Sequence, residues 1–470
     1  MKKTNAFFRI LSIIILLLLT AIPVNASSIE TEDFSVTRGC HTIDAQVPLL
    51  GTEATLPNAY AAFLYDYENK TVLYAHGADD RNYPSSLVKI MTGLIVAERA
   101  NMSEEITVKA EQLSSLPTDS LGINLQDGEI ISMQNLLYAI LVESANDAAV
   151  VAAESICGSQ ESFVAEMNRY AQELGCNNTN FMNVHGLHDP DQYSSARDIA
   201  RILAKAAENE IFMDAFSTVN YTIPATNLSE ARELSSGNFL MNDSMMTIYL
   251  DSRVTGGRSG IISTGERNLA VTAEYNDIKL ISVVLGSFSQ VAADGWSVVE
   301  FGSFKETTQL LNMGFEGYHS VQLFYADQAL KQFKVTNGDS YVSTGILNPI
   351  NILMPYGISY NDLTYRYNEA STVIHAPVKR GDYISTVEVW HNDVCLAQES
   401  LYALHDVNEA QAIQELDISE KPAKSGFDIL LYVGIIVILL VVLLFGRRFI
   451  FRLMHNRRIR RHRKRRRRSH

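Results

Sequence analysis

Apolar residues dominate three stretches of the chain at the spacing of a helix with a buried face, namely Leu87–Ala97, Ile131–Leu141 and the segment after Asn146. Only a short polar stretch separates the second from the third. The pattern therefore predicts two buried helices that are joined by a tight connection, Glu143–Ala149, from which Ser144 and Asn146 project.

Shorter runs with the composition of strands flank these helices. Two pairs of such runs, each interrupted by a polar turn, predict antiparallel hairpins. The first pair is Ala61–Tyr67 with Thr71–Tyr74, and the second is Asn268–Glu274 with Lys279–Gly286. From residue 317 to about 405 only short alternating runs occur, so we expect an all-β accessory domain there.

The N-terminal residues 1–26 have the pattern of a secretory signal. Lys2, Lys3 and Arg9 form its basic region, an apolar region follows, and Val24-Asn25-Ala26 supplies the small residues of a cleavage site. A retained N-terminal anchor is the alternative interpretation.

A second apolar run predicts a transmembrane helix over residues 429–446, because Ile429–Phe445 carries no charge. Residues 447–470 contain twelve arginines and one lysine but no acid. This excess of positive charge predicts a cytoplasmic tail and an extracytoplasmic location for the chain before residue 428. An amphipathic helix on the membrane surface is the alternative.

The net charge of −14 conceals this division of charge. Without the basic residues of the signal and the tail, 23 basic residues stand against 53 acidic ones, which gives the exported part about −30. Such an excess disfavours nucleic acid as an external partner. The basic tail adjoins the predicted membrane helix, so we expect it to contact anionic lipid, with RNA as the alternative.

The four cysteines, Cys40, Cys157, Cys176 and Cys395, show neither Cys-x-x-Cys spacing nor a zinc pattern. Cys157 and Cys176 flank a predicted helix, Glu161–Leu174, and would lie too far apart to form a disulfide. We expect all four to be free or buried thiols.

The first helical stretch opens with Pro84–Thr92, where a serine and a lysine stand three residues apart. With Ser85 as the expected N-cap, Ser86 falls in the first turn and Lys89 lies on the same face of the helix. A serine becomes a nucleophile when a neighbouring base takes its proton, and a partly buried lysine can be that base. Ser-x-x-Lys also arises by chance, so the spacing needs support from other residues.

Two further segments can supply that support. Ser144 and Asn146 place a hydroxyl and an amide on the connection between buried helices, although Ser144 could instead only cap the second helix. Ser236-Gly237-Asn238 has the same form but lacks the buried-helix setting. The strand Val254–Ile262 combines glycines with Arg258, which suits strand addition by a peptide; a turn with a surface arginine is the alternative.

His185, His188 and Asp189 suggest a metal site. However, no further histidine or acidic ligand follows at helical spacing, and the neighbouring glycine and proline favour a rigid loop. We therefore expect no metal.

Together, Ser86-x-x-Lys89, Ser144-x-Asn146 and Arg258-Ser259-Gly260 resemble the motifs of the D-alanyl-D-alanine carboxypeptidases, the low-molecular-mass penicillin-binding proteins. The resemblance extends over about Asn58–Leu404 and includes His185–Pro190. It implies an α/β (α+β) catalytic domain like that of serine β-lactamases and penicillin-binding proteins, a small all-β second domain and a C-terminal membrane anchor. It also implies a peptidoglycan stem pentapeptide as substrate, covalent inhibition by β-lactams, and no cofactor.

The resemblance also implies a role for each site residue. These roles are nucleophile for Ser86, general base for Lys89 and proton relay for Ser144. Asn146 holds the substrate amide and the lysine, Arg258 and Ser259 bind the substrate carboxylate, and Gly260 contributes to substrate binding. The backbone N–H groups of Ser86 and Ile261 form the oxyanion hole.

The chain departs from the family pattern Val-x-Gly-x-Lys-Thr-Gly, because Arg258 and Ser259 replace the lysine and the threonine. An arginine can clamp a carboxylate but does not lose a proton at neutral pH. Ser303 and Lys305 stand where the family often has an arginine that holds the substrate carboxylate. A membrane-tethered peptidoglycan-binding homologue with weak or lost turnover is thus the main alternative; a β-lactamase and a cross-link endopeptidase are others.

The expected organisation is a signal (1–26), a leader (27–57), a catalytic domain (58–316), an all-β domain (317–405), a linker (406–428), a transmembrane helix (429–446) and a basic tail (447–470).

Overall fold

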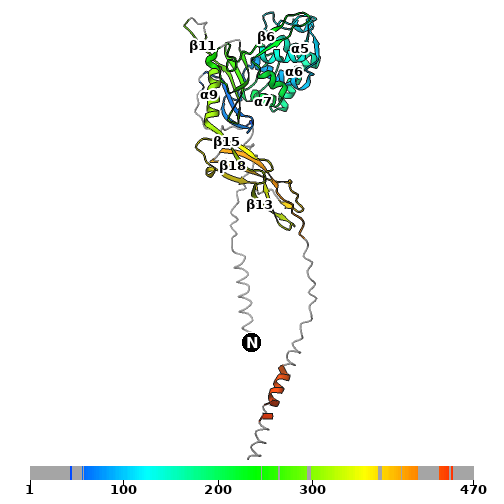
Figure 1. Cartoon of the computed structure of the whole chain (residues 1–470), viewed down its shortest axis with the longest axis vertical. Coiled ribbons are helices and arrows are strands. Elements are labelled where there is room, and N and C mark those ends of the chain that lie inside the picture. Colours follow the sequence, from blue (N-terminus) through cyan, green and yellow to red (C-terminus); the bar gives the residue numbers. More distant parts are fainter. Residues whose placement is uncertain are drawn as a thin grey trace, which may run out of the picture. The chain divides into compact units, whose positions relative to one another are not determined.

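The computed structural model describes residues 43–44, 56, 58–244, 246–262, 265–293, 298–368, 373–392, 394–410, 433–443 and 446–447 (Figure 1). The predicted signal lies outside these residues, as do most of the predicted leader, linker and basic tail. The chain divides into two compact units, Met1–Asn408 and Glu409–His470.

Within the second unit, residues 433–443 form a helix. Among the residues that the structure describes, no helix combines the length and the apolar character needed to cross a membrane. The predicted span, residues 429–446, extends beyond the described residues and stays a prediction.

A five-stranded antiparallel sheet forms the centre of the part of the first unit that precedes Tyr318. Its strands follow the order β2-β1-β9-β8-β7, so that β7 lies at one edge. Their bounds are Ala61–Asp66 (β1), Thr71–His76 (β2), Val254–Ile261 (β7), Arg267–Tyr275 (β8) and Ile278–Ser287 (β9). Both predicted hairpins, β1–β2 and β8–β9, are confirmed.

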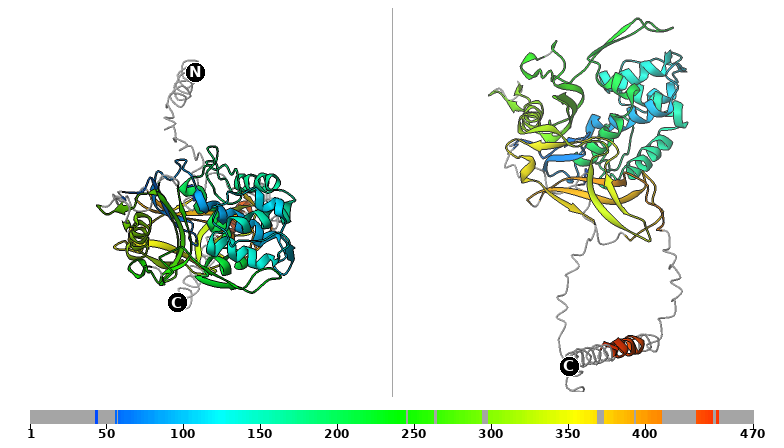
Figure 2. Two further views of the ribbon diagram at one scale, coloured as in Figure 1. Left: turned by 90° about the horizontal axis from the view of Figure 1, so that it is seen from above. Right: turned by 60° about the horizontal axis from the view of Figure 1, so that its bottom comes forward.

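Strand β1 is buried along its whole length because helices cover both faces of the sheet. Successive side chains alternate between the faces, so Phe63 belongs to one hydrophobic core and Leu64 to another. Helix α7 (Ala196–Ala206) packs on β1 and β9, whereas α9 (Gly302–Gly317) packs on β8 and β9 from the other side. The helices α5 and α6 gather on the side of α7 (Figures 1 and 2).

Further helices and several shorter strands complete this part. They are η1 (Ser85–Leu87), α2 (Val88–Arg99), β3 (Glu105–Thr107), α3 (Ala110–Ser114), β4 (Ile130–Ser132), α4 (Met133–Tyr138), η2 (Ala139–Glu143), α5 (Asn146–Cys157), α6 (Gln160–Glu173), α8 (Glu210–Phe216), β5 (Asn220–Ile223), β6 (Arg232–Ser235), η3 (Thr247–Tyr249), β10 (Gln290–Val291) and β11 (Val298–Glu300).

The helix predicted from Ile131 begins later than expected. Ile131 pairs with Ile106 of β3 as part of β4, and the hydroxyl of Ser132 then caps α4 by accepting the N–H of Asn135. A long-range strand pair therefore replaces the first turn of the predicted helix.

From Tyr318 the chain forms the predicted all-β domain. Its strands are β12 (Tyr318–Phe324), β13 (Ala329–Thr336), β14 (Tyr341–Gly345), β15 (Ile350–Pro355), β16 (Thr364–Tyr367), β17 (Ile374–His375), β18 (Tyr383–His391) and β19 (Val394–Ala403), with a short turn η4 (Tyr360–Asp362). Six of them form one sheet, β16-β18-β19-β14-β13-β17, and β12 pairs with β15. The domain has its own core, which includes Val342, Val387 and Leu401.

One cysteine prediction is wrong. Cys157 and Cys176 are free thiols, as expected. Cys395, which lies on β19 of the all-β domain, instead takes part in a disulfide bond. Sequence spacing gave no sign of this bond, because a disulfide depends on which distant segments the fold brings together.

Candidate active site

The serine and the lysine of the first motif lie on one continuous helical segment. Ser86 belongs to the turn η1, which leads directly into α2, and Lys89 follows one turn later. Ser85 is not the N-cap that we predicted, because its hydroxyl donates to the carbonyl of Ile261 (2.7 Å) instead. That bond ties the turn that carries Ser86 to the edge strand β7.

Lys89 is completely buried, and its amine has two acceptors. Nζ donates to Oδ1 of Asn146 (2.6 Å) and to the backbone carbonyl of His185. The chain approaches the motif closely at this point: a Cβ on Gly186 would lie 2.1 Å from the carbonyl oxygen of Ser85, and Gly186 has φ +87°. Only glycine allows this contact, which brings the His185 carbonyl to the lysine.

Burial holds the pKa of Lys89 well below its ordinary value, and the nearby positive charge of Arg258 lowers it further, while Asp147 opposes the shift. The pKa of His185 falls to about 3, first through burial and then through the charge of Lys89. The imidazole is therefore neutral at physiological pH. A lysine in these surroundings is available as a base near neutrality.

The second motif lies on an unusual turn. Helix α4 continues into the π-helical turn η2, after which Ser144 adopts the left-handed conformation with φ 67°. Ser144 is not the N-cap of α5, since Ala145 holds that position, so the capping interpretation is wrong. The Ser144 hydroxyl is buried and has no hydrogen-bond partner among the described residues.

Asn146 connects the lysine to the far wall of the site. Its Oδ1 accepts from Lys89, and its Nδ2 donates to the hydroxyl of Ser120 (2.7 Å). The following carboxylate, Asp147, accepts the N–H groups of Ile123 and Leu125, both at 3.1 Å. Asn146 and Asp147 therefore also hold the loop between α3 and β4 in place. Leu121 of this loop lines the pocket.

The third motif lies on β7, directly beside the serine. A Cβ on Gly260 would lie 3.0 Å from the backbone nitrogen of Ser86, so a side chain there would crowd this N–H group. Ser259 donates its hydroxyl hydrogen to the carbonyl of Gly237 (3.2 Å). Arg258 is buried, and its Nη1 donates to the carbonyls of Leu141 (2.9 Å) and Val142 (3.3 Å).

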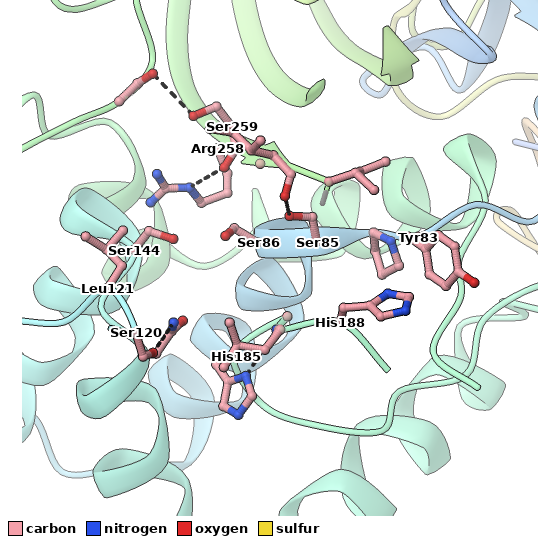
Figure 3. Close-up of a pocket in the computed structure, with 18 of the residues that line it drawn as sticks. Tyr83, Ser85, Ser86, Ser120, Leu121, Ser144, His185, His188, Arg258 and Ser259 are labelled. Atoms are coloured by element: carbon pink, nitrogen blue, oxygen red, sulfur yellow. Dashed lines mark hydrogen bonds between the residues drawn. The ribbon is translucent and has the colours of Figure 1, made fainter. Parts of the chain in front are cut away.

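All three motifs line one cavity of about 700 Å³, a volume suited to a small peptide ligand. Figure 3 shows the hydroxyls of Ser86 and Ser144 directed toward one another across this space, with the Arg258 guanidinium beside them. The predicted residues that line it are Ser86, Ser144, Asn146, Arg258, Ser259, Gly260 and Ile261, while Lys89 lies buried behind the wall.

Sequence reasoning missed several residues of the pocket. Ser236 and Gly237 line it, although their segment was set aside for lack of a buried helix. Ser120 belongs to no recognisable motif, and only its hydrogen bond with Asn146 shows that it is part of the site. His188 also lines the pocket and makes an aromatic contact with Tyr83, with ring centroids 4.7 Å apart. The described residues include no cluster of three or more histidine, cysteine or acidic side chains that could hold a metal.

Comparison with known proteins adds independent findings. Residues 51–289 match the family model of D-alanyl-D-alanine carboxypeptidase, and residues 318–409 match that of the C-terminal domain of penicillin-binding protein 5. The chain is 30% identical over 377 residues to a D-alanyl-D-alanine carboxypeptidase, DacA, of Haemophilus influenzae, covering 78% of this chain and 90% of that protein. It is 29% identical over 369 residues to DacC of Escherichia coli, covering 76% and 86%.

Among solved structures, penicillin-binding protein 5 from Haemophilus influenzae is similar to this chain. The TM-score is 0.64 at 29% sequence identity, over 76% of this chain and 100% of that chain. The similarity therefore includes both the catalytic part and the all-β domain.

Proposed function

The chain belongs to the D-alanyl-D-alanine carboxypeptidase family of serine peptidases, and from this membership we propose how its own residues remove the terminal D-alanine of a peptidoglycan stem peptide. The protein is a serine-type D-alanyl-D-alanine carboxypeptidase of the penicillin-binding class. Assignment of each step to a residue is our proposal.

In the first step Ser86 attacks the carbonyl carbon of the penultimate D-alanine, and Lys89 accepts the Ser86 proton. One observation carries this assignment. A neutral amine has two N–H donors and one lone pair. The two acceptors beside the Lys89 amine are Oδ1 of Asn146 and the carbonyl of His185, and they can take its two hydrogens. The lone pair is then left for the serine proton.

The negative charge that develops on the carbonyl oxygen needs donors beside Ser86. We assign this role to the backbone N–H groups of Ser86 and Ile261. The close approach of Gly260 to the Ser86 nitrogen supports it, as does the bond from Ser85 to the Ile261 carbonyl, because both hold the turn and the strand in register.

Collapse of the tetrahedral intermediate breaks the peptide bond, and the leaving amine of D-alanine takes a proton. Ser144 delivers that proton and regains one from Lys89. The Ser144 hydroxyl is buried and has no hydrogen-bond partner among the described residues. This supports the role, because such a hydroxyl is available to donate one proton and accept another. Asn146 holds the lysine and the substrate amide, and water then hydrolyses the Ser86 ester.

The carboxylate of the departing D-alanine binds at β7, between Arg258 and Ser259, with Gly260 giving the peptide backbone room to approach. Arg258 supplies a positive charge on the pocket wall. Two of its nitrogens are bonded to backbone carbonyls, and the third, Nη2, makes no hydrogen bond with the described residues. That remaining N–H group can meet one carboxylate oxygen.

The test uses the exported part of the chain with labelled penicillin and a peptide that ends in D-Ala-D-Ala. We expect Ser86→Ala to abolish both labelling and D-alanine release, whereas Ser236→Ala, which removes another hydroxyl that lines the pocket, keeps the label. Equal labelling of Ser86→Ala and wild type would remove Ser86 as the nucleophile. Labelling of wild type without D-alanine release would favour the homologue that binds peptidoglycan without turnover.

We further propose that residues 429–446 anchor the enzyme in the bacterial membrane, with the catalytic domain outside and the tail inside. The uncharged run and the basic residues after it support this topology. We expect deletion of residues 429–470 to release the enzyme from membranes. Neutralising the tail alone should weaken binding to vesicles that contain anionic lipid.

A further inference from the structure

The turn that carries Ser144 leaves backbone carbonyls without helical partners. In a helix the carbonyl of Leu141 would accept an N–H group four or five residues later, from Ala145 or Asn146. Here the N–H of Ala145 donates to Ala139 (3.0 Å), and that of Asn146 donates to Leu121 (2.8 Å). The π-helical turn and the left-handed residue that follows it divert both donors.

Arg258 satisfies these carbonyls from outside the helix. Its Nη1 donates to Leu141 (2.9 Å) and to Val142 (3.3 Å), and its Nε donates to the carbonyl of Ser259 (3.3 Å). The last contact fixes the guanidinium on its own strand. A buried carbonyl without a donor is costly, so the conformation of the turn depends on this side chain.

We propose that Arg258 is a positioning residue, which holds the left-handed turn through the carbonyls of Leu141 and Val142 and thereby presents Ser144 and Asn146 to the reacting atoms. This inference rests on the proposed function, in which those two side chains act. It goes beyond carboxylate binding, because the contacts to the turn exist without any substrate.

The choice of arginine follows from the geometry. The guanidinium reaches two carbonyls of the turn and one of its own strand while one nitrogen stays available to a ligand. A lysine amine could serve the two turn carbonyls, which both accept from Nη1, but it has no second nitrogen that bonds the Ser259 carbonyl and fixes the head group on its own strand. Burial of the cation is visible in the pKa of Arg258, which falls to about 10 in spite of the nearby carboxylate of Glu143.

A substrate without a carboxylate separates positioning from binding. We suggest measuring acylation of Ser86 by a neutral nitrophenyl ester beside turnover of a D-Ala-D-Ala peptide, in wild type, Arg258→Lys and Arg258→Gln. Arg253→Lys, whose arginine pairs with Asp251 away from the pocket, is the matched control. We expect Arg258→Lys to lower the rate with both substrates by about 10- to 100-fold, because small misplacements of catalytic groups are costly.

The pH profile gives a second readout. The charged and titratable groups that face Lys89 are Arg258 from β7, Asp147 from α5 and His185 from its loop. Arg258→Gln removes a positive charge, so the acid limb of ester acylation should move to higher pH. Arg258→Lys keeps the positive charge, so the acid limb should stay at the same pH while the rate of ester acylation falls.

Two outcomes would overturn the inference. One is ester acylation at the wild-type rate in Arg258→Lys with only the peptide KM raised, which would leave Arg258 as a carboxylate ligand and the proposed function intact. The other is unchanged hydrogen exchange at Ala145 and Asn146 in Arg258→Gln, which reports on the turn even in a variant too weakly active to assay. A wild-type protein that reacts with neither substrate would instead contradict the proposed function.

Discussion

Two of the Ser-x-Asn segments of this protein reach the same cavity. Ser144-Ala145-Asn146 connects two buried helices, and Ser236-Gly237-Asn238 follows strand β6. Ser144 and Asn146 line the pocket from one side, and Ser236 and Gly237 line it from another. The three-residue pattern and the location at the pocket therefore do not distinguish the two segments; their side-chain hydrogen bonds do.

The Asn146 side chain of the first segment bonds to distant parts of the chain, whereas the Ser236 and Asn238 side chains of the second accept from neighbouring backbone N–H groups. Asn146 joins Lys89, 57 residues away, to Ser120. The hydroxyl of Ser236 instead accepts the N–H of Asn238 (3.3 Å), and Asn238 accepts that of Leu240 (3.1 Å). Such local bonds build a turn. The same Ser-x-Asn pattern thus takes part in the reaction in one place, in our proposal, and only shapes the pocket in the other.

The largest expected effect comes from the two serines. Ser144→Ala should lower kcat/KM for a D-Ala-D-Ala peptide by about 10²- to 10⁴-fold, the usual range for a lost proton-transfer group. Ser236→Ala should stay within about threefold, because its hydroxyl is occupied by a local bond. Steady-state kinetics of the two variants side by side checks this. Equal losses would mean that both segments take part in the chemistry.

The two asparagines should differ in what they affect. Asn146→Ala removes an acceptor of Lys89, and we expect acylation by penicillin to slow by about 10²- to 10³-fold. Asn238→Ala leaves the N–H of Leu240 without its acceptor, so it should cost about 1 kcal/mol of unfolding free energy while acylation is preserved. Stopped-flow acylation and urea denaturation measure the two quantities. A stable but slowly acylated Asn238→Ala protein would contradict the assignment of catalysis to Asn146 and of stability to Asn238.

A glycine next to the second segment sharpens the comparison. A Cβ on Gly257 would lie 2.2 Å from Nδ2 of Asn238 and 2.9 Å from Val271. Gly257→Ala should therefore cost about 1 to 3 kcal/mol of stability. Part of this cost should disappear when Asn238 is also alanine, which a double-mutant cycle measures directly. Purely additive costs would show that Asn238 is not what limits the space.

Much of the fold could be predicted from the sequence, because local patterns determine it. The hairpins β1–β2 and β8–β9 follow from short apolar runs that end in polar turns, and both are present. The three motifs were expected to meet, and they line one cavity. Chemistry that depends on residue type and close spacing was therefore visible in the sequence.

What sequence reasoning missed depends on contacts between distant residues. The hydroxyl of Ser85 bonds to Ile261, 176 residues away, instead of capping its helix. The left-handed conformation of Ser144 and the contact of Arg258 with Leu141 arise only once β7 packs beside the turn. The disulfide of Cys395 likewise depends on the tertiary fold. No local pattern encodes these contacts.

The smallest expected effect comes from a residue that only the first segment has. Asp147 follows Asn146, whereas Phe239 follows Asn238. The Asp147 carboxylate opposes the lowering of the Lys89 pKa, so Asp147→Asn should lower that pKa further. Lys89 must be neutral to accept the Ser86 proton, and it loses its own proton as the pH rises. The acid limb of ester acylation should therefore move to lower pH.

The direction of this shift tests the role of Lys89 more sharply than its loss, because removing the amine abolishes activity under many mechanisms. Asp119→Asn is the matched control: it removes an exposed carboxylate from the pocket rim, where water screens the charge, and should leave the limb in place. Asp147 also holds the N–H groups of Ile123 and Leu125, so some loss of rate is expected without bearing on the argument. If the acid limb moved to higher pH in Asp147→Asn, the group that titrates there would not be Lys89, whose charged form the Asp147 carboxylate stabilises. The difference between the two Ser-x-Asn segments would then need another chemical explanation.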